Sequence, residues 1–190
     1  MNIYLASGSP RRAHMLTEWG ISFSILQTDV DEIMLDAAPG DSALQNALAK
    51  ARAGGRQVRD GLVIGADTVV ASDGHILGKP HDKAEARNML LLLEGHEHRV
   101  VTAMAGLRMP EERIATRIST TVVRMRCLSN AEREAYLCNP EYADKAGAYA
   151  VQGLAASFIE GIDGPMDTII GFTMSDFYAL CNELNVDLRR

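Results

Sequence analysis

The sequence predicts an α/β fold with a mixed sheet, and two observations carry that prediction. Runs of apolar and β-branched residues alternate with segments whose apolar residues recur every three or four positions, the period of an amphipathic helix. Some strand-like runs are joined by short turns and therefore pair antiparallel, whereas others are separated by a helix. With 190 residues, 47% of them hydrophobic, the chain has enough material for one packed domain. We expect a single domain over residues 1–190.

Strand and helix patterns alternate in the first third of the chain. The predicted strands are 2–7 and 22–29, and the predicted helices are 11–19 and 41–58. In the first helix, Leu16 and Trp19 face inward and Gly20 provides the C-cap. The second helix has an apolar stripe formed by Leu44, Ala47, Leu48 and Ala51.

The middle and the end of the chain combine hairpins with further helices. A buried strand over 62–71 turns at "SDG" into 75–80, and "HRVVTAMAGLRM" pairs with "RIATRISTTVVRMRCL" as a long hairpin. Two helices begin at capping patterns, Asp82 with Glu85 and Ser129 with Glu132. The remaining predicted elements are short strands around 148–153 and 157–162 and a final helix over 174–184.

Charge and cysteine content exclude several classes of protein. The net charge is −6, so the chain lacks the excess of basic residues that a general nucleic-acid-binding protein needs. Cys127, Cys138 and Cys181 form no C-x-x-C pair, which argues against a disulfide framework and a zinc site. We find no signal-peptide pattern and no apolar run of the ~18 residues that span a membrane. We therefore expect a soluble cytoplasmic protein that binds neither nucleic acid nor membrane.

A candidate anion site follows the first strand. The stretch "SGSPRR" places Arg11 and Arg12 at a helix N-terminus, where the helix dipole disfavours positive charge. A turn rich in Gly and Ser presents backbone N–H groups, and two guanidinium groups beside them complete a cradle for phosphate. The alternative is that both arginines point into solvent and Pro10 simply starts the helix.

A carboxylate inside the strand "LVIGADTVVA" is the second candidate. Asp67 shares a strand face with Val63, Gly65 and Val69, so we expect it to be half-buried. A carboxylate in such a place needs a cation, a metal ion or several N–H donors. The alternative is a strand-end aspartate that is bonded to a loop.

Further charged residues lie near these two motifs. Lys50 is at the margin of the apolar stripe of its helix, and Lys79 is in the loop "GKP". Asp29, Asp31 and Glu32 form an acidic cluster that would suit the Mg²⁺ of a nucleotide, because Mg²⁺ takes carboxylate and phosphate oxygens. Taken alone, the lysines are typical of a solvated surface and the acids of an ordinary loop.

The histidines in "HEH" point to no metal site. His96 and His98 have no third ligand at a metal-binding spacing. We expect them to lie at the surface or to form hydrogen bonds.

Together these stretches resemble the Maf family of nucleoside triphosphate pyrophosphatases. The resemblance covers almost the whole chain, in order and at consistent spacing. It is carried by "LASGSPRRAHML" at 5–16, "VDE" at 30–32, "LAKARA" at 48–53, "GADTVV" at 65–70, "LGKP" at 77–80, "HRVVTA" at 98–103 and "DKAGAYAVQG" at 144–153, with a looser match in "IEGIDGPMDTIIGF" at 159–172.

The resemblance implies both a fold and a reaction. The fold is similar to that of the inosine triphosphate pyrophosphatases, with a strongly twisted mixed sheet, flanking helices and a central cleft between two lobes. The reaction is hydrolysis between the α- and β-phosphates of a nucleoside triphosphate, which gives the monophosphate and pyrophosphate with a divalent cation, Mg²⁺ or Mn²⁺. A homodimer is also implied.

Site residues follow from the same resemblance. Asp67 corresponds to the family's proton acceptor, and Glu32 lies with it at the metal side. The phosphate-handling positions are Ser7, Arg11, Arg12, Lys50 and Lys79. These assignments fit the chemistry, because water needs a base and the charge of a triphosphate needs fixed cations.

Three specificity positions resemble the dTTP/UTP branch of the family more than its 7-methyl-GTP branch. They are Arg11, Thr68 and Gln152. The chain departs from the family at "GFTM", 171–174, where "GLPL" is usual, and in the bulky "PEYADKAG" around Asp144. Either departure would alter the rim of the cleft or a dimer contact.

A different class of function is the alternative. Maf proteins are associated with septum formation and division arrest, so the chain could be a nucleotide-sensing regulator with slow turnover. The set of Asp67, Glu32, Lys50 and Lys79 favours catalysis, because sensing alone needs no base. Which canonical or modified pyrimidine nucleotide is the physiological substrate stays open at this point.

Overall fold

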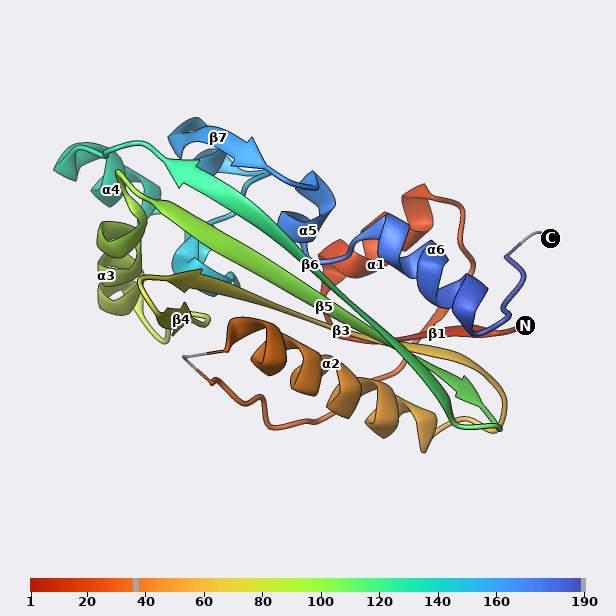
Figure 1. The fold of residues 1–190 in the computed structure, drawn as a ribbon. Coiled ribbons are helices and arrows are strands. Elements are labelled where there is room, and N and C mark those ends of the chain that lie inside the picture. Colours follow the sequence, from red (N-terminus) through yellow and green to blue (C-terminus); the bar gives the residue numbers. More distant parts are fainter. Residues whose placement is uncertain (36–37, 189–190) are drawn as a thin grey trace.

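One mixed sheet of seven strands runs through the part of the protein that the computed structural model describes, residues 1–35 and 38–188 (Figure 1). Residues 36–37 and 189–190 of the predicted domain lie outside this part. The strands are β1 (Ile3–Ala6), β2 (Ser24–Ile25), β3 (Gly61–Ser72), β4 (His75–Leu77), β5 (Glu97–Met109), β6 (Arg113–Met125) and β7 (Ile159–Asp163). The helices are α1 (Pro10–Glu18), α2 (Pro39–Gly55), α3 (Lys83–Leu93), α4 (Asn130–Tyr136), α5 (Met166–Ile170) and α6 (Met174–Glu183), with 3₁₀ turns η1 (Pro140–Tyr142), η2 (Ala146–Ala148) and η3 (Leu154–Phe158).

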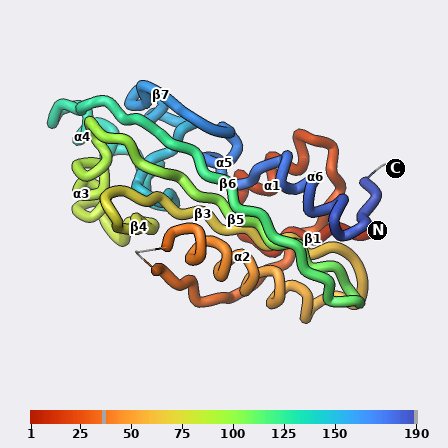
Figure 2. Tube along the Cα trace, viewed as in Figure 1, coloured from red at the N-terminus to blue at the C-terminus, as the bar shows by residue number. Residues whose placement is uncertain are grey.

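The sheet combines parallel and antiparallel pairs, as the sequence predicts. β1 runs parallel to β2 and to β3, because helices α1 and α2 connect these strands. β3, β5, β6 and β7 pair antiparallel in that order. β3, β5 and β6 contain 12, 13 and 13 residues, and they extend from one end of the molecule to the other (Figure 2). Both ends are therefore built on the same three strands.

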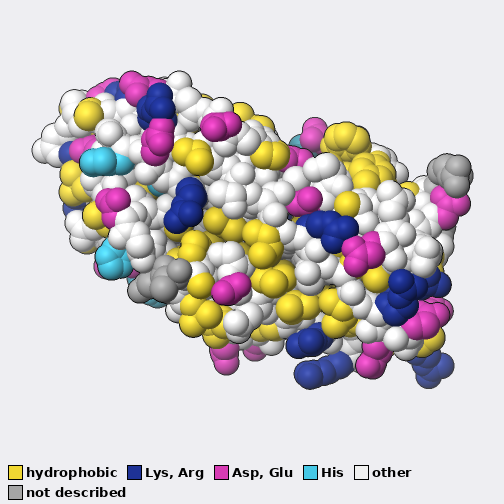
Figure 3. Space-filling view, in the orientation of Figure 1, with side chains coloured by type: hydrophobic (Ala, Val, Ile, Leu, Met, Phe, Trp, Pro, Cys, Tyr) yellow, Lys and Arg dark blue, Asp and Glu magenta, His cyan; other side chains and the backbone are white. Residues whose placement is uncertain are grey.

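The helices divide the molecule into two lobes along these strands. At one end, α1 and α6 pack on one face of the sheet and α2 packs on the opposite face (Figure 1). At the other end, α3 and α4 lie with the 3₁₀ turns around the strand termini. Between the lobes, hydrophobic side chains gather across the middle of the visible face, over the sheet and α2 (Figure 3).

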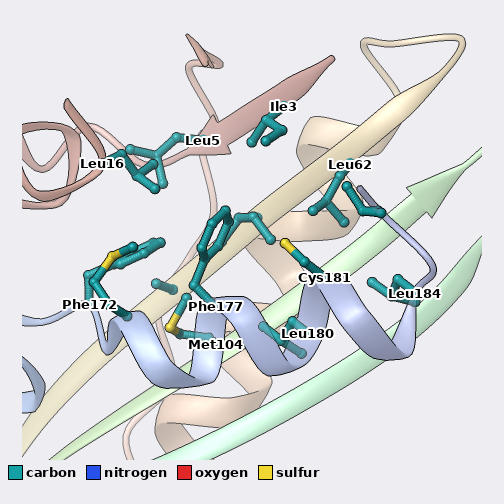
Figure 4. Close-up of a cluster of buried hydrophobic side chains, with 14 of the residues drawn as sticks. Ile3, Leu5, Leu16, Leu62, Met104, Phe172, Phe177, Leu180, Cys181 and Leu184 are labelled. Atoms are coloured by element: carbon teal, nitrogen blue, oxygen red, sulfur yellow. The ribbon is translucent and has the colours of Figure 1, made fainter. Parts of the chain in front are cut away.

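The core of the first lobe lies between α6, α1 and the sheet. Phe177, Leu180 and Cys181 recur every three or four residues on the inner side of α6, where they face Leu62 and Met104 of β3 and β5 (Figure 4). Each of these five side chains is at most 1% exposed. The face is thus a continuous apolar surface that fixes α6 to the sheet.

The segment "GFTM" contributes to this core. Phe172 and Met174 belong to the apolar cluster, and Thr173 is fully buried with its hydroxyl 3.2 Å from that of Thr168. In this segment only Gly171 reaches toward the cleft, through its carbonyl oxygen. The departure from the family pattern at residues 172–174 therefore affects the packing of the core and not the rim of the cleft.

Small residues let α2 lie unusually close to β3. Ala47 and Ala51 line the inner side of the helix and face Gly65 of the strand. A β-carbon at Gly65 would lie 2.1 Å from the carbonyl oxygen of Ala47 and 2.6 Å from the backbone nitrogen of Ala51. This approach brings the middle of α2 within side-chain reach of residues 65–67 of the strand.

One element predicted for the second lobe is wrong. The expected strand around 148–153 is absent, because Gly147 and Ala148 have φ values of 70° and 61° in the turn η2. Such left-handed residues end an extended segment. The turn places Gly147 against Val70 and Leu93 in the core of this lobe. The other predicted short strand, at 157–162, is confirmed as β7 with shifted bounds.

The first helix differs from the prediction at its C-terminal end. Trp19 is the C-cap residue, 56% exposed, and it forms an edge-to-face contact with Tyr178 instead of pointing inward. Gly20 follows with a φ of 68°, which turns the chain so that Ile21 packs against the core. The predicted strand over 22–29 shortens to β2.

Gly65→Ala tests the close approach of α2. We expect the substitution to lower the free energy of unfolding by at least about 3 kcal/mol. The added methyl group meets backbone atoms of α2, which can move away only if the whole helix shifts. Gly40→Ala in the first turn of α2 is the control, since among the described residues its β-carbon meets only Ile118, at 3.8 and 3.9 Å. Denaturant unfolding measures both changes. Equal stability of the two variants would contradict the close packing of α2 on β3.

Candidate active site

A cavity lies where one edge of β3 has no neighbouring strand. The pairing of β1 with β3 ends at Ala6 and Gly65, and the pairing of β4 with β3 begins at Val70 and Leu77. β3 residues 66–69 therefore have no strand partner on that edge among the described residues. A cavity of about 610 Å³ lies beside this gap and is bounded by both lobes.

The structure brings all nine sequence-predicted site residues to this cavity. They come from separate segments of the chain and all contribute to its lining: Ser7, Arg11, Arg12, Glu32, Lys50, Asp67, Thr68, Lys79 and Gln152. One part of the lining is polar and charged. Another part is apolar, formed by Val70, Val100, Tyr149, Val151, Ile169 and Ile170.

Arg12 is a buried cation at the floor of the cavity. Its Nε donates to the carbonyl oxygen of Gly171 at 2.8 Å, one terminal nitrogen donates to Ser7 Oγ at 3.0 Å, and the other donates to Thr68 Oγ1 at 3.1 Å. Burial lowers the pKa of Arg12 below its ordinary value, while the charge of Asp67 opposes that change. No carboxylate of the described residues accepts a hydrogen bond from Arg12. Its positive charge is therefore available to an anion in the cavity.

Arg11 has a different environment at the rim. Its side chain is 35% exposed, and a terminal nitrogen lies 3.4 Å from a carboxylate oxygen of Asp144. Lys145 pairs with the same carboxylate. The two arginines thus differ, since one is fixed in the floor and the other reaches across from one lobe to the other.

Asp67 is buried and is held by both of its oxygens. It is 5% exposed, so it is fully buried, not half-buried as predicted. Lys50 Nζ donates to Oδ1 at 2.7 Å, and Asn46 Nδ2 donates to Oδ2 at 3.0 Å. Both partners project from α2, which the glycine at position 65 brings close to the strand. Each carboxylate oxygen keeps a lone pair for a further donor.

Lys50 connects the two acidic residues of the site. Its Nζ also donates to Glu32 Oε1 at 2.6 Å. Burial disfavours the charged form of Glu32, but the hydrogen bond and charge of Lys50, with the charges of Lys79 and Arg12, hold its pKa below the ordinary value. Glu32 and Asp67 are therefore a carboxylate pair that shares one positive charge.

The carboxylate pair is the arrangement that could hold a metal ion. Among the described residues no group of three His, Cys, Asp or Glu side chains is placed to bind one. Two carboxylates completed by phosphate oxygens and water are a donor set that suits Mg²⁺. Lys50 already occupies the space between Glu32 and Asp67 with a positive charge, so the pair fits a cation.

The remaining candidates lie around the other walls. Lys79 follows Gly78, whose carbonyl oxygen accepts from the backbone nitrogen of Gly147 at 3.0 Å, so its loop is attached to the second lobe. Gln152 is exposed at the edge of the cavity. Its loop is held by a hydrogen bond from the backbone nitrogen of Leu154 to Glu141.

Comparison with known proteins decides the family. A family model described as Maf-like protein matches residues 2–184. The chain belongs to the Maf-like protein family.

Relatives of this Maf-like protein carry one common name. The chain is 39% identical to the dTTP/UTP pyrophosphatase of Alkalilimnicola ehrlichii, with 100% of the chain and 96% of the relative covered. It is 37% identical to the proteins of the same name from Dictyoglomus turgidum and Bacillus anthracis, with 98% of the chain and 97% of each relative covered. No helix among the described residues of this Maf-like protein is long and apolar enough to cross a membrane.

Sequence reasoning missed three residues of the Maf-like site. Asp144 and Lys145 stand in a stretch that carries the resemblance, but their contact with Arg11 depends on the folded position of the second lobe. Asn46 was missed although it leaves a signal. It precedes Lys50 by one helical turn and puts an amide at the inner side of α2, next to Ala47.

His98 forms a hydrogen bond, in agreement with the prediction for the "HEH" stretch. Its Nε2 lies 2.7 Å from the hydroxyl of Tyr149, whose ring lines the cavity. His96 is exposed, and its Nδ1 lies 2.8 Å from the carbonyl oxygen of Glu94. The pair of His98 and Tyr149 therefore supports the apolar wall of the cavity.

The burial of His98 predicts a loss of stability in acid. Burial lowers its pKa from 6.5 to about 4. Below pH 6.5 the unfolded chain binds a proton that the folded protein does not bind until about pH 4, so the free energy of unfolding falls across this interval. The loss from this group is roughly 3 kcal/mol.

Denaturant unfolding between pH 7 and pH 4 measures this contribution. His98→Gln keeps a hydrogen-bonding side chain toward Tyr149 but has no group that titrates. Between pH 7 and pH 4 the free energy of unfolding of this variant should fall by roughly 3 kcal/mol less than that of the wild type. Parallel curves for the two proteins would exclude His98 as the cause.

Proposed function

We propose that this Maf-like protein is a nucleoside triphosphate pyrophosphatase that hydrolyses dTTP and UTP to the monophosphate and pyrophosphate. The observation that supports this proposal best is a cavity in which a buried arginine, with no acidic hydrogen-bond partner among the described residues, faces a buried, hydrogen-bonded carboxylate. The relatives named dTTP/UTP pyrophosphatase support the substrate. We further propose a cytoplasmic location. The homodimer implied by the family resemblance stays a prediction.

The cationic part of the cavity binds the triphosphate in this proposal. Arg12 is already fixed by three hydrogen bonds, so its charge needs no reorganisation when phosphate oxygens arrive. Ser7, Arg11 and Lys79 surround the same space. The turn before α1 adds backbone N–H groups, so the helix N-terminus and the arginines attract the same ligand.

Asp67 is the general base for the attacking water. Lys50 and Asn46 fix the carboxylate and leave a lone pair on each oxygen, so one oxygen can accept a proton from water while the other stays bonded. Burial among Ala47, Ala51 and the strand excludes competing solvent from the apolar side.

A divalent cation, Mg²⁺ or Mn²⁺, is part of the proposal, and Glu32 and Asp67 would hold it. When bound, it would neutralise phosphate charge and favour a nucleophilic water. Lys50 lies between these two carboxylates and keeps them close together before a cation binds.

The apolar part of the cavity takes the nucleotide base. Tyr149, Val70 and Ile169 offer surface for a planar ring, and Gln152 stands at the edge with one amide donor and one carbonyl acceptor. Uracil and thymine have an N3–H donor beside carbonyl acceptors and can pair with such an amide. Cytosine has an acceptor at N3 and an amine at C4, so the amide would have to turn over.

Asp67→Asn tests the proposed chemistry. Wild type should release pyrophosphate and monophosphate from UTP with Mg²⁺ or Mn²⁺ and stop when a chelator is added. The variant should lose at least about 100-fold in kcat with an unchanged fold. Asp163→Asn, an exposed position of β7 outside the cavity, is the control and should keep full activity. Nucleoside diphosphate and orthophosphate as products would exclude this mechanism.

A panel of nucleotides tests the base preference. We expect kcat/KM for dTTP and UTP to exceed that for dCTP, dATP and dGTP, because a polar group of the base or of Gln152 that binding removes from water and leaves unpaired costs about 1–3 kcal/mol. 5-Methyl-UTP should be accepted. Gln152→Glu should reduce the preference for dTTP and UTP, since a carboxylate has no donor for a carbonyl oxygen. A flat panel, or 7-methyl-GTP as the best substrate, would place the protein outside this branch.

A further inference from the structure

A buried amide on α2 is bonded to both acidic segments of the site. Asn46 is 3% exposed, and its Nδ2 donates to Asp67 Oδ2 and to the carbonyl oxygen of Ile33, each at 3.0 Å. Its Oδ1 accepts from the backbone nitrogen of Ile33 at 2.9 Å. Both N–H donors and the carbonyl oxygen are thus engaged. If the amide turned over, its NH₂ group would face the Ile33 N–H and its oxygen would face two acceptors, so only one orientation is stable.

Asn46 and Lys50 hold the same two segments by different means. They are four residues apart and project from the same side of α2. Lys50 bonds the other oxygen of Asp67 and the side chain of Glu32, whereas Asn46 bonds the backbone of the residue that follows Glu32. The helix is therefore joined twice to Asp67 and twice to segment 32–33, in each case once through a charged group and once through a neutral one.

The neutral connection has a role that the charged one cannot fill. A divalent cation between Glu32 and Asp67 would compete with the ammonium group of Lys50 for their oxygens, because both positive charges would occupy one place. Asn46 carries no charge and binds Asp67 on the oxygen that Lys50 does not use. Its hydrogen bonds can persist while Lys50 moves.

We propose that Asn46 is a positioning residue that keeps the Asp67 carboxylate and the Glu32 segment at cation-binding separation after Lys50 leaves the space between them. This inference rests on the proposed function, in which these two acids hold the metal. The amide would lower the stability of the protein without these partners, since a buried polar group is favourable only when it is bonded. A leucine of similar size would fill the same space beside Ala47 without organising the acids.

Titration of Mn²⁺ into the protein, followed by the relaxation of water protons, tests the inference without turnover. Asn46→Leu should bind Mn²⁺ at least about 10-fold more weakly than wild type. Its kcat for UTP should fall at least about 10-fold, whereas KM for UTP should change less than about threefold, because the phosphate-binding arginines are untouched. If the leucine variant does not fold, Asn46→Ala adds no bulk and is measured in its place.

Two control variants separate positioning of the carboxylate from simple attachment of the loop. Ser42 attaches the same loop further along, since its Oγ accepts from the backbone nitrogen of Leu35 at 2.7 Å, but it does not contact Asp67. Gln45 is the exposed neighbour of Asn46. Ser42→Ala and Gln45→Leu should both stay within about twofold of wild type in Mn²⁺ affinity and kcat.

Several outcomes would overturn the inference. They are wild-type Mn²⁺ affinity in folded Asn46→Leu, equal losses in Ser42→Ala, or no Mn²⁺ binding by wild type. Failure of the proposed function looks different, because wild type would then bind Mn²⁺ and lose affinity on Asn46 substitution while releasing no pyrophosphate from any nucleoside triphosphate.

Discussion

The close approach of α2 to β3 determines the geometry of the candidate site. Gly65 has no side chain, and Ala47 and Ala51 have short ones, so the helix backbone contacts the strand directly. A larger residue at any of these three places would move the helix outward. Asn46 and Lys50 would then lie too far from Asp67 for hydrogen bonds of 3.0 and 2.7 Å. The polar chemistry of the cavity thus depends on an apolar contact beside it.

The acidic groups of the cavity have a cationic partner, whereas the buried arginine has no anionic one among the described residues. The two carboxylates share Lys50, whereas Arg12, within the part of the chain that the structure describes, donates only to neutral oxygens. Such a site lowers its electrostatic energy when it takes up an anion, since the hydrogen bonds that hold Arg12 need not be broken. This imbalance also explains the two arginines at the start of α1, which in isolation oppose the helix dipole.

Much of this arrangement could be predicted from the sequence because local patterns determine it. The alternation of strands and helices indicated the mixed sheet, and "SGSPRR" and "GADTVV" indicated Arg11, Arg12 and Asp67 as candidates. The full set of residues that meet in the cavity was implied by the resemblance to the Maf family. The expected strand near Tyr149 could not form, because the left-handed turn at Gly147 is stabilised by packing against distant Val70. Trp19 was assigned to the inner side of its helix, but the turn at Gly20 gives that place to Ile21.

The role of Asn46 could not be predicted from local patterns. A polar residue beside an apolar helix stripe leaves only a weak signal, and its partners lie 13 and 21 positions away in the chain. The same is true of Asp144, whose contact with Arg11 joins the two lobes across 133 positions. Contacts of this kind depend on how the sheet twists, which no short stretch of sequence encodes.

The three long strands have a mechanical consequence for the cleft. β3, β5 and β6 pass from one lobe to the other, and the register of their pairing shows no irregularity between β3 and β5 or between β5 and β6. A hinge needs a few residues whose φ and ψ can change freely. Residues in a continuous ladder of backbone hydrogen bonds lack this freedom, so these three strands contain no hinge between the lobes. The width of the cleft is therefore set by the twist of the sheet, which resists change over its whole length. Adjustment to a bound molecule is left to the loops at the rim, such as those that carry Lys79 and Gln152.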